Sequence, residues 1–311
     1  MALHSQTAAF LETMARAKTP SLESLPIEVT RRALLIGAGV DPNPPELAKT
    51  ENQIVIRPDG TEMPVRIHVP NGAGPFGVCL YFHGGGWALN SIETHDALVK
   101  RLAAESGCVF VNVEYRLAPE HKYPAAIEDA YTAVKWVHDR ASELGCDPNR
   151  IAVSGDSAGG NLAAVVCLMS RDRGGPKIAY QVLIYPITDC DFQRSSYIEN
   201  GEGYFLTRQE MKWFWDLYVS SPEQMREPYA SPLLSPSLRD LPPALILTAE
   251  YDPLRDEGEA YAQALQAAGV KTILRRYDGV IHAFMRRFQQ FDTAHVAIRD
   301  VADELKKAIG N

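Results

Sequence analysis

A short turn of small residues at 155–159 constrains the fold of this chain more than any other segment. It reads GDSAG, follows an apolar run at 151–153 and precedes an apolar stretch, 161–169, that predicts a buried helix. A serine at so sharp a strand-to-helix bend takes a sparsely allowed backbone conformation, and side chains two residues to either side would collide. Gly155 and Gly159 remove those side chains. Ser157 then stands clear of the sheet at a helix N-terminus, which is the geometry of a nucleophile elbow.

Apolar strands and helices alternate on both sides of this turn. Continuous apolar runs predict buried parallel strands, and Pro and Gly mark the helix ends. The expected strands lie at 53–56, 63–69, 77–82, 108–113, 151–153, 178–184, 245–249 and 272–277, and the expected helices at 96–106, 124–144, 161–169, 257–268 and 292–309. The first two strands form an antiparallel hairpin around an Asp-Gly turn. The pattern therefore predicts an α/β fold, with an eight-stranded, mostly parallel sheet and helices on both faces.

Two segments are expected outside the sheet. Residues 1–50 predict amphipathic helices at 5–16 and 27–40, which precede the first strand and must pack on the sheet or over its mouth. The insertion at about 186–243 has no strand pattern and is rich in aromatic residues. It follows a strand at the carboxyl edge, where open α/β sheets bind ligands. We therefore expect an N-terminal cap segment, 1–50, and a catalytic domain, 51–311, whose insertion completes the cap. Alternatively, most of these aromatics only bury the inserted helices against the sheet.

The serine turn requires a base later in the chain. In hydrolases with this strand–turn–helix element the order is serine, then carboxylate, then histidine. Only His282 and His295 follow Ser157. His282 comes directly after the last strand, at the same edge of the sheet, whereas His295 falls within the final helix. We therefore predict that His282 is the base.

The acid that orients the base should follow the strand at 245–249. Asp252 precedes a proline in a turn at the sheet edge, and we predict that it accepts the imidazole N–H. Glu250 is the alternative. Asp256 fits better as a negative charge at the start of the next helix. Any of these carboxylates could instead be a solvated turn residue.

A glycine run, HGGGW at 83–87, follows the third strand. The oxyanion formed in acyl transfer needs backbone N–H donors from the residue after the nucleophile and from this loop. We predict that Ala158, Gly84 and Gly85 supply them, with Gly86 able to replace one of the two glycines. Glycines suit the loop because the backbone can approach the substrate closely.

Four further residues are expected around the site. His83 precedes the serine in the chain, so we expect it to hold the glycine loop and not to act as the base. Trp87 either lines the acyl or alcohol pocket or packs in the core. Asp156 and Phe205 are also expected to lie next to the catalytic residues or in the substrate pocket.

Composition argues against several other classes of protein. A net charge of −8 with scattered Lys and Arg argues against nucleic acid and anionic membranes as partners. Metal-ligand clusters and phosphate-binding glycine motifs are absent from the sequence, so we expect no metal and no cofactor.

Cys79, Cys108 and Cys167 fall in apolar runs and predict buried free thiols. With no secretion signal and no apolar run of about 18 residues, we expect a cytoplasmic protein.

Five separated motifs resemble the hormone-sensitive-lipase-like family of α/β-hydrolases, the bacterial type IV esterases. They are HGGGW at 83–87, YRLAPE at 115–120, GDSAGGNLA at 155–163, DPLRD at 252–256 and HAF at 282–284. The match runs in order from about residue 50 to 300, whereas the first 50 residues match only in helical character. The motifs place the family's catalytic triad on Ser157, Asp252 and His282.

The resemblance implies an α/β-hydrolase fold with a helical cap. It also implies a carboxylesterase that hydrolyses short to medium acyl esters through an acyl-enzyme. Family members often pair as homodimers through the last strand, here 271–277, and an exposed sheet edge there would allow such pairing.

Two other functions remain open at this stage. One is a ligand-binding receptor that keeps the hydrolase fold without the chemistry, although an intact serine, histidine and aspartate argue against it. The other is a related lyase, such as a dehydratase, that uses the same oxyanion hole. Hydrolysis of long, insoluble triglycerides or of peptides is less expected, since nothing in the sequence indicates it.

Overall fold

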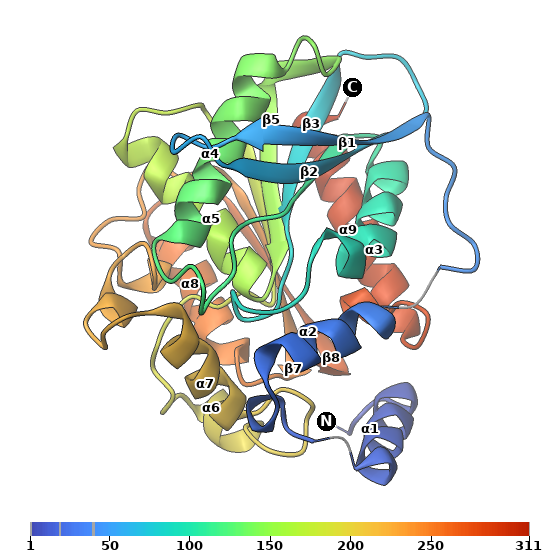
Figure 1. Cartoon of the computed structure of the whole chain (residues 1–311), viewed down its shortest axis with the longest axis vertical. Helices are drawn as coiled ribbons and strands as arrows, with labels where there is room; N and C mark the ends of the chain where they lie inside the picture. The colour runs from blue at the N-terminus through green and yellow to red at the C-terminus, as the bar shows by residue number, and fades with distance from the viewer. Residues whose placement is uncertain (1, 19, 39–40, 311) are drawn as a thin grey trace.

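An eight-stranded sheet runs through the computed structural model, which describes residues 2–18, 20–38 and 41–310 (Figure 1). The strand order is β1-β2-β4-β3-β5-β6-β7-β8. The strands are β1 (Lys49–Ile56), β2 (Glu62–Val69), β3 (Phe76–Phe82), β4 (Val109–Val113), β5 (Cys146–Asp156), β6 (Tyr180–Ile184), β7 (Ala244–Tyr251) and β8 (Thr272–Ile281). The β1–β2 hairpin is antiparallel and β2 pairs antiparallel with β4, while all other neighbours are parallel. The predicted fold class is confirmed.

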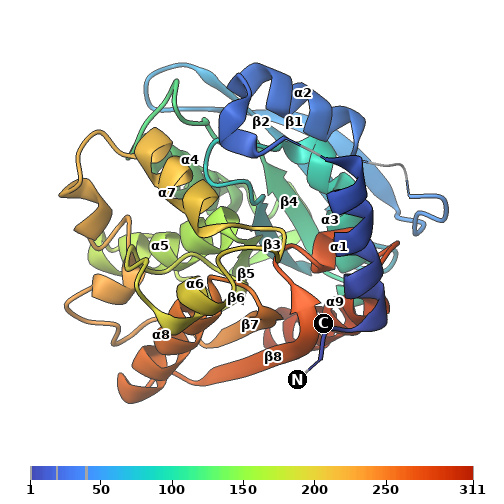
Figure 2. The ribbon, with the colours of Figure 1, turned by 90° about the horizontal axis from the view of Figure 1, so that it is seen from below.

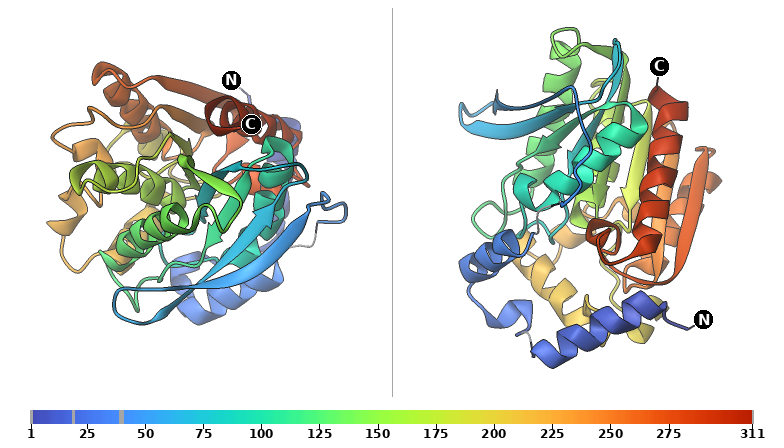
Figure 3. Two further views of the ribbon diagram at one scale, coloured as in Figure 1. Left: turned by 90° about the horizontal axis from the view of Figure 1, so that it is seen from above. Right: turned by 90° about the vertical axis from the view of Figure 1, so that its right-hand side faces the viewer.

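Helices cover both faces of the sheet (Figure 3). One face carries α3 (Ile92–Ser106) and α9 (Asp292–Ile309), which pack against each other. The other face carries α4 (Ala125–Arg140), α5 (Ala158–Asp172) and α8 (Arg255–Ala267).

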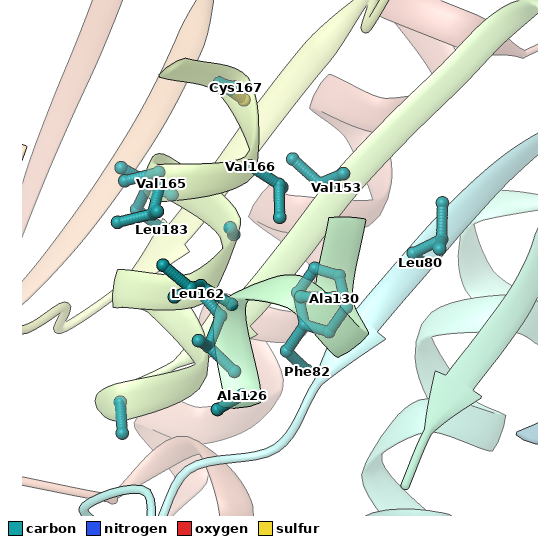
Figure 4. Close-up of a cluster of buried hydrophobic side chains, with 14 of the residues drawn as sticks. Leu80, Phe82, Ala126, Ala130, Val153, Leu162, Val165, Val166, Cys167 and Leu183 are labelled. Atoms are coloured by element: carbon teal, nitrogen blue, oxygen red, sulfur yellow. The ribbon is translucent and has the colours of Figure 1, made fainter. Parts of the chain in front are cut away.

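Helix α5 lies at the centre of the second layer and is buried along nearly its whole length. Its side chains Leu162 and Val166 lie in one apolar cluster with Phe82 of β3, Val153 of β5 and Ala130 of α4 (Figure 4). Burying an aliphatic side chain of this size stabilises the fold by roughly 1.5–3 kcal/mol. The helix that follows Ser157 is thus packed between the sheet and α4.

A second group of helices gathers at one end of the molecule, the lower end in Figure 1 and the near side in Figure 2. It consists of α1 (Ser5–Ala17), α2 (Ile27–Ile36), α6 (Ser195–Glu199) and α7 (Arg208–Tyr218), with the short 3-10 helices η1 (Leu22–Ser24), η2 (Gln224–Arg226) and η3 (Pro232–Leu234) in the connections. The N–H of His4 donates to the carbonyl of Gly279 near the end of β8, at 3.0 Å. The N-terminal helices therefore meet the carboxyl edge of the sheet, while the division at residue 50 stays a prediction.

Element boundaries differ from the predicted ones where local capping decides them. Helix α3 begins at Ile92, four residues early, because Ser91 and Thr94 form a capping box. Helix α4 ends at Arg140 and leads into a turn that closes at Gly145, whose φ is +67°. The second N-terminal helix ends at Ile36. Residues 39–40, which were also predicted to be helical, lie outside the described residues.

The outer strand β8 forms one edge of the sheet. Pairing of two chains through this edge stays a prediction. All five cysteines are free thiols, and the three predicted to be buried are buried. Within the described ranges, no helix is long and apolar enough to cross a membrane.

Candidate active site

Ser157 occupies the turn between β5 and α5 in a strained backbone conformation. Its φ of 57° and ψ of −120° lie in a region that residues with side chains rarely adopt. A Cβ on Gly159 would lie 1.8 Å from the carbonyl oxygen of Phe82, and one on Gly155 would lie 2.3 Å from the carbonyl oxygen of Gly159. The N–H of Ser157 donates to the carbonyl of Ile184 in β6, at 2.9 Å. The turn is therefore held by close packing at the two glycines and by one backbone hydrogen bond to β6.

The structure brings Ser157, Asp252 and His282 into one chain of hydrogen bonds. Nε2 of His282 lies 3.0 Å from Oγ of Ser157, although 125 positions separate the two residues. Nδ1 of His282 lies 2.7 Å from Oδ2 of Asp252, whose other oxygen accepts the N–H of Leu254 at 2.8 Å. The three side chains come from residues that are at most 6% exposed. A carboxylate at Nδ1 keeps the ring proton there, so Nε2 can accept the proton of the serine hydroxyl.

Helix α6 of the insertion is tied to the loop that carries Asp252. The side-chain amide of Asn200 donates to the carbonyls of Glu250 and Asp252, at 3.2 and 3.3 Å. The hydroxyl of Ser196 donates to the carbonyl of Pro253 at 2.6 Å. The insertion therefore supports the position of this carboxylate.

The other candidates for base and acid lie apart from this chain of hydrogen bonds. Glu250 accepts the N–H of Gly279 at 2.7 Å, and Asp256 accepts the N–H of Ser196 at 2.8 Å in the first turn of α8. His295 lies on α9, partly exposed. In the part of the chain that the structure describes, no hydrogen bond joins any of the three to the serine.

Asp156, the residue before the serine, holds the glycine loop. Its Oδ1 accepts the N–H of Gly84 and the hydroxyl of Tyr81, both at 2.9 Å, and lies 3.3 Å from Nε2 of His95. Burial raises the pKa of Asp156, but the nearby His95 and the hydroxyl of Tyr81 outweigh it and hold the pKa well below its usual range. The carboxylate is therefore ionised, and it links the serine turn to the loop after β3.

The position of Gly84 differs from the prediction. Its N–H is already donated to Asp156, so it is not available to an oxyanion, and a Cβ there would lie 2.5 Å from Oδ2 of the same carboxylate. Within residues 2–18, 20–38 and 41–310, no hydrogen bond occupies the N–H groups of Gly85, Gly86 and Ala158. The geometry therefore favours the alternative in which Gly86 replaces Gly84.

His83 lies behind the glycine loop. Its ring stacks on Tyr115 at 4.3 Å, its Nδ1 lies 2.9 Å from the carbonyl oxygen of Gly84, and the hydroxyl of Tyr115 donates to the His83 carbonyl at 2.7 Å. Burial, together with the neighbouring His95, lowers the pKa of His83 to about 3. This neutral ring is placed to hold the loop, in keeping with its predicted role.

Trp87 and Phe205 contribute to packing beside the site. Trp87 is fully buried, stacks on Tyr218 at 4.1 Å and meets Trp215 edge-on at 4.9 Å. Of its two predicted roles, core packing fits this position. Phe205 is half-buried and lies 5.9 Å from the ring of Phe10 in α1, so it joins the insertion to the N-terminal helices. Its role in a pocket stays a prediction.

Three residues near the site were not found from the sequence. Tyr185 is fully buried, and its ring meets that of His282 edge-on at 4.9 Å. It follows the carboxyl end of β6, a position that could have drawn attention to it. Tyr81 and His95 hold Asp156, but neither belongs to a motif that would reveal this contact.

The residues near the serine do not form a metal centre. In the described ranges, no group of three or more His, Cys, Asp or Glu is arranged to hold a metal ion. The histidines around the site have separate partners: His83 contacts backbone, His95 contacts Asp156, and His282 contacts Asp252.

Comparison with known proteins decides the family. A family model for the alpha/beta hydrolase fold matches residues 79–286, which include the glycine loop and all three residues of the hydrogen-bonded chain. This chain belongs to the α/β-hydrolases. Within them it belongs to the hormone-sensitive-lipase-like esterases, in agreement with its five motifs.

Relatives of this hydrolase carry esterase names. It is 47% identical over 234 residues to the carboxylic ester hydrolase LipN of Mycobacterium tuberculosis, covering 73% of this chain and 62% of LipN. It is 35% identical over 323 residues to the ethyl acetate hydrolase of Pseudomonas putida, covering 99% of each. The solved structure of the hyperthermophilic esterase of Pyrobaculum calidifontis matches with a TM-score of 0.93 and 41% identity, over 99% of both chains. These similarities support carboxylesterase activity.

The buried ring of His83 is expected to stay neutral in the folded hydrolase from about pH 8 down to about pH 5. Its folded pKa of about 3 lies below the unfolded value of about 6.5. As the pH falls through that unfolded value, the unfolded chain takes up a proton that the folded chain does not. Folding stability then decreases by up to about 1.4 kcal/mol per pH unit from this residue. An NMR titration of the ring signal, assigned by its loss in His83→Asn, measures this; a titration step within that range contradicts it.

Proposed function

We propose that this hydrolase cleaves carboxylic esters through an acyl-enzyme formed on Ser157, with His282 as the base and Asp252 as the acid that orients it. The observation that carries the proposal is the continuous hydrogen-bonded chain, with contacts of 3.0 and 2.7 Å, at the start of a buried helix. The esterase names of the relatives agree with it.

Acylation begins when Oγ of Ser157 attacks the carbonyl carbon of the ester. The hydroxyl proton passes to Nε2 of His282, and the C=O electron pair moves onto oxygen to form a tetrahedral oxyanion. Asp252 stabilises the resulting imidazolium across the 2.7 Å contact. The C–O bond to the alcohol then breaks, and the imidazolium gives its proton to the leaving oxygen.

The N–H groups of Gly85, Gly86 and Ala158 are proposed to bind the oxyanion, because no other partner among the described residues occupies them. One such donor is worth roughly 3–4 kcal/mol of the barrier. Asp156 keeps the loop in place by binding Gly84. Deacylation repeats these steps with water: His282 removes a proton from water, which attacks the acyl carbon, and Ser157 leaves as the restored hydroxyl.

Ser157→Ala is expected to abolish hydrolysis of p-nitrophenyl butyrate, with kcat reduced by about 10⁶-fold, because no nucleophile remains. Circular dichroism and urea unfolding should match those of the parent, since alanine adds no atom to the packed turn. Turnover retained in the folded variant would refute the acyl-enzyme. A folded parent protein without turnover would favour a ligand-binding role instead.

Asp252→Asn is expected to lower kcat by about 10⁴-fold, because an amide at this position stabilises the wrong tautomer of the imidazole. Glu250→Gln is the matched control, since that carboxylate lies two positions away and binds backbone instead of His282. Steady-state kinetics on both variants measure the difference. Equal losses, or a larger loss in the control, would move the acid to Glu250.

The substrates are proposed to be esters of short to medium acyl chains. Ser157 is only 6% exposed, and the N-terminal helices and the insertion lie at the same edge of the sheet. A confined site favours small acyl groups over long ones, and one relative is named for ethyl acetate. A series of p-nitrophenyl esters should give the highest kcat/KM between acetate and octanoate. A rise that continues to palmitate would overturn this substrate class.

A further inference from the structure

A cavity of about 150 Å³ lies between the end of α2, helix α3 and the 3-10 helix η4 (Met285–Arg287). Its volume is several times the roughly 30 Å³ that one water molecule occupies in the liquid. Its walls include Arg286, Arg287 and the apolar side chains of Leu98 and Phe288, and no Asp or Glu among the described residues. The cavity is therefore positively charged in a protein whose net charge is −8.

The two arginines of this cavity have no anionic partner. Across the described residues, the guanidinium of neither Arg286 nor Arg287 forms a hydrogen bond or ion pair, and the buried Nε of Arg287 has no acceptor. Most other half-buried or buried arginines of the described residues are paired, as Arg57 is with Asp129 at 2.9 Å, although the buried Nε of Arg208 also has no acceptor. A partly desolvated cation without a partner is unfavourable, because burial removes the water that would solvate it.

The position of Arg287 is fixed by aromatic rings. Its guanidinium lies 4.8 Å from the ring centre of Phe10 and 4.6 Å from that of Phe205. Burial and the adjacent Arg286 lower the pKa of Arg287 to about 9. Two neighbouring cations repel each other, and an anion beside them would reduce this repulsion.

Arg286 also acts electrostatically on Asp156, but that carboxylate is already occupied. Its oxygens bind Gly84, Tyr81 and His95. The N–H groups of Arg286 are therefore not used by the serine turn.

We propose that this cavity binds a small oxyanion, a phosphate or a carboxylate, through the guanidinium of Arg286, with Arg287 as the neighbouring positive charge. A planar guanidinium presents paired N–H donors that match two oxygens of either anion. The apolar side chains of Leu98 and Phe288 lower the polarity of part of the wall, which strengthens the charge attraction. The anion is either free in solution or a group carried by the substrate. Its binding does not depend on the proposed ester hydrolysis.

Calorimetry with inorganic phosphate at fixed ionic strength tests the site on the full chain. We expect saturable binding of one phosphate per chain, weakened about tenfold or more in Arg286→Gln, because charge-assisted bonds are lost. Arg286→Lys keeps the charge without the paired donors and should bind with intermediate affinity, which provides a test if the glutamine variant fails to fold. Arg299→Gln, at an exposed arginine of α9, is the matched control and should bind like the parent. Absence of saturable binding, or equal binding by the parent and Arg286→Gln, would overturn the proposal.

Ester hydrolysis assays then distinguish a free anion from an anionic group carried by the substrate. Turnover of neutral p-nitrophenyl butyrate is compared with that of a p-nitrophenyl ester ending in a carboxylate, with and without phosphate. If the substrate carries the anion, phosphate raises KM for the charged ester alone, and Arg286→Gln removes this effect. If the anion is free in solution, phosphate still binds, but the KM values of the neutral and the charged ester respond to it alike. Either result requires the saturable phosphate binding described above, so it supports the site.

Discussion

The strained backbone at Ser157 is the constraint on which the rest of the site depends. A residue with a side chain at φ 57° and ψ −120° costs about 1–3 kcal/mol relative to a relaxed conformation, and packing around it must offset that cost. Gly155 and Gly159 allow the turn to press against the end of β3, and the buried helix α5 fixes its far side. Ala283, beside His282, also has a positive φ of 61°. Positive-φ residues thus occur both at the serine turn and directly after the histidine.

The same turn sets the position of the glycine loop. Asp156 is the neighbour of Ser157 in the chain, and its carboxylate binds the N–H of Gly84. Nucleophile and loop are therefore linked through two adjacent residues and one charge-assisted hydrogen bond. The acid is supported separately, by Asn200 and Ser196 of the insertion. The inserted segment at the carboxyl edge of the sheet thus contributes to the order of the site.

Much of this arrangement could be predicted from the sequence, because it follows from local patterns. Apolar runs and one hairpin turn located all eight strands, although β1 and β5 begin earlier than predicted, and the positions of Asp252 and His282 after strand ends brought them to one edge. The role of Gly84 could not be predicted in the same way. Whether a loop N–H faces a substrate or a buried carboxylate depends on a tertiary contact with Asp156, 72 residues away.

Other features that the sequence left unpredicted have the same cause. His95 lies inside an amphipathic helix, and only the folded chain shows that it faces Asp156. From the sequence, Arg286 and Arg287 cannot be told from ordinary surface residues. Only the folded chain shows that both are half-buried and that their guanidinium groups have no anionic partner among the described residues. The early start of α3 at Ile92 has a local cause instead: its capping box uses a threonine in the third helical position, a weaker signal than the usual Glu or Gln.

The central claim is that Ser157 is the nucleophile and that His282 activates it. Its most direct measurement is mass spectrometry of the protein after treatment with a p-nitrophenyl dialkyl phosphate, which transfers its phosphoryl group to an activated serine. We predict one dialkylphosphoryl group per chain, located by peptide mapping on Ser157, and no labelling in His282→Ala. Stable label on another residue, or equal labelling without His282, would contradict the account.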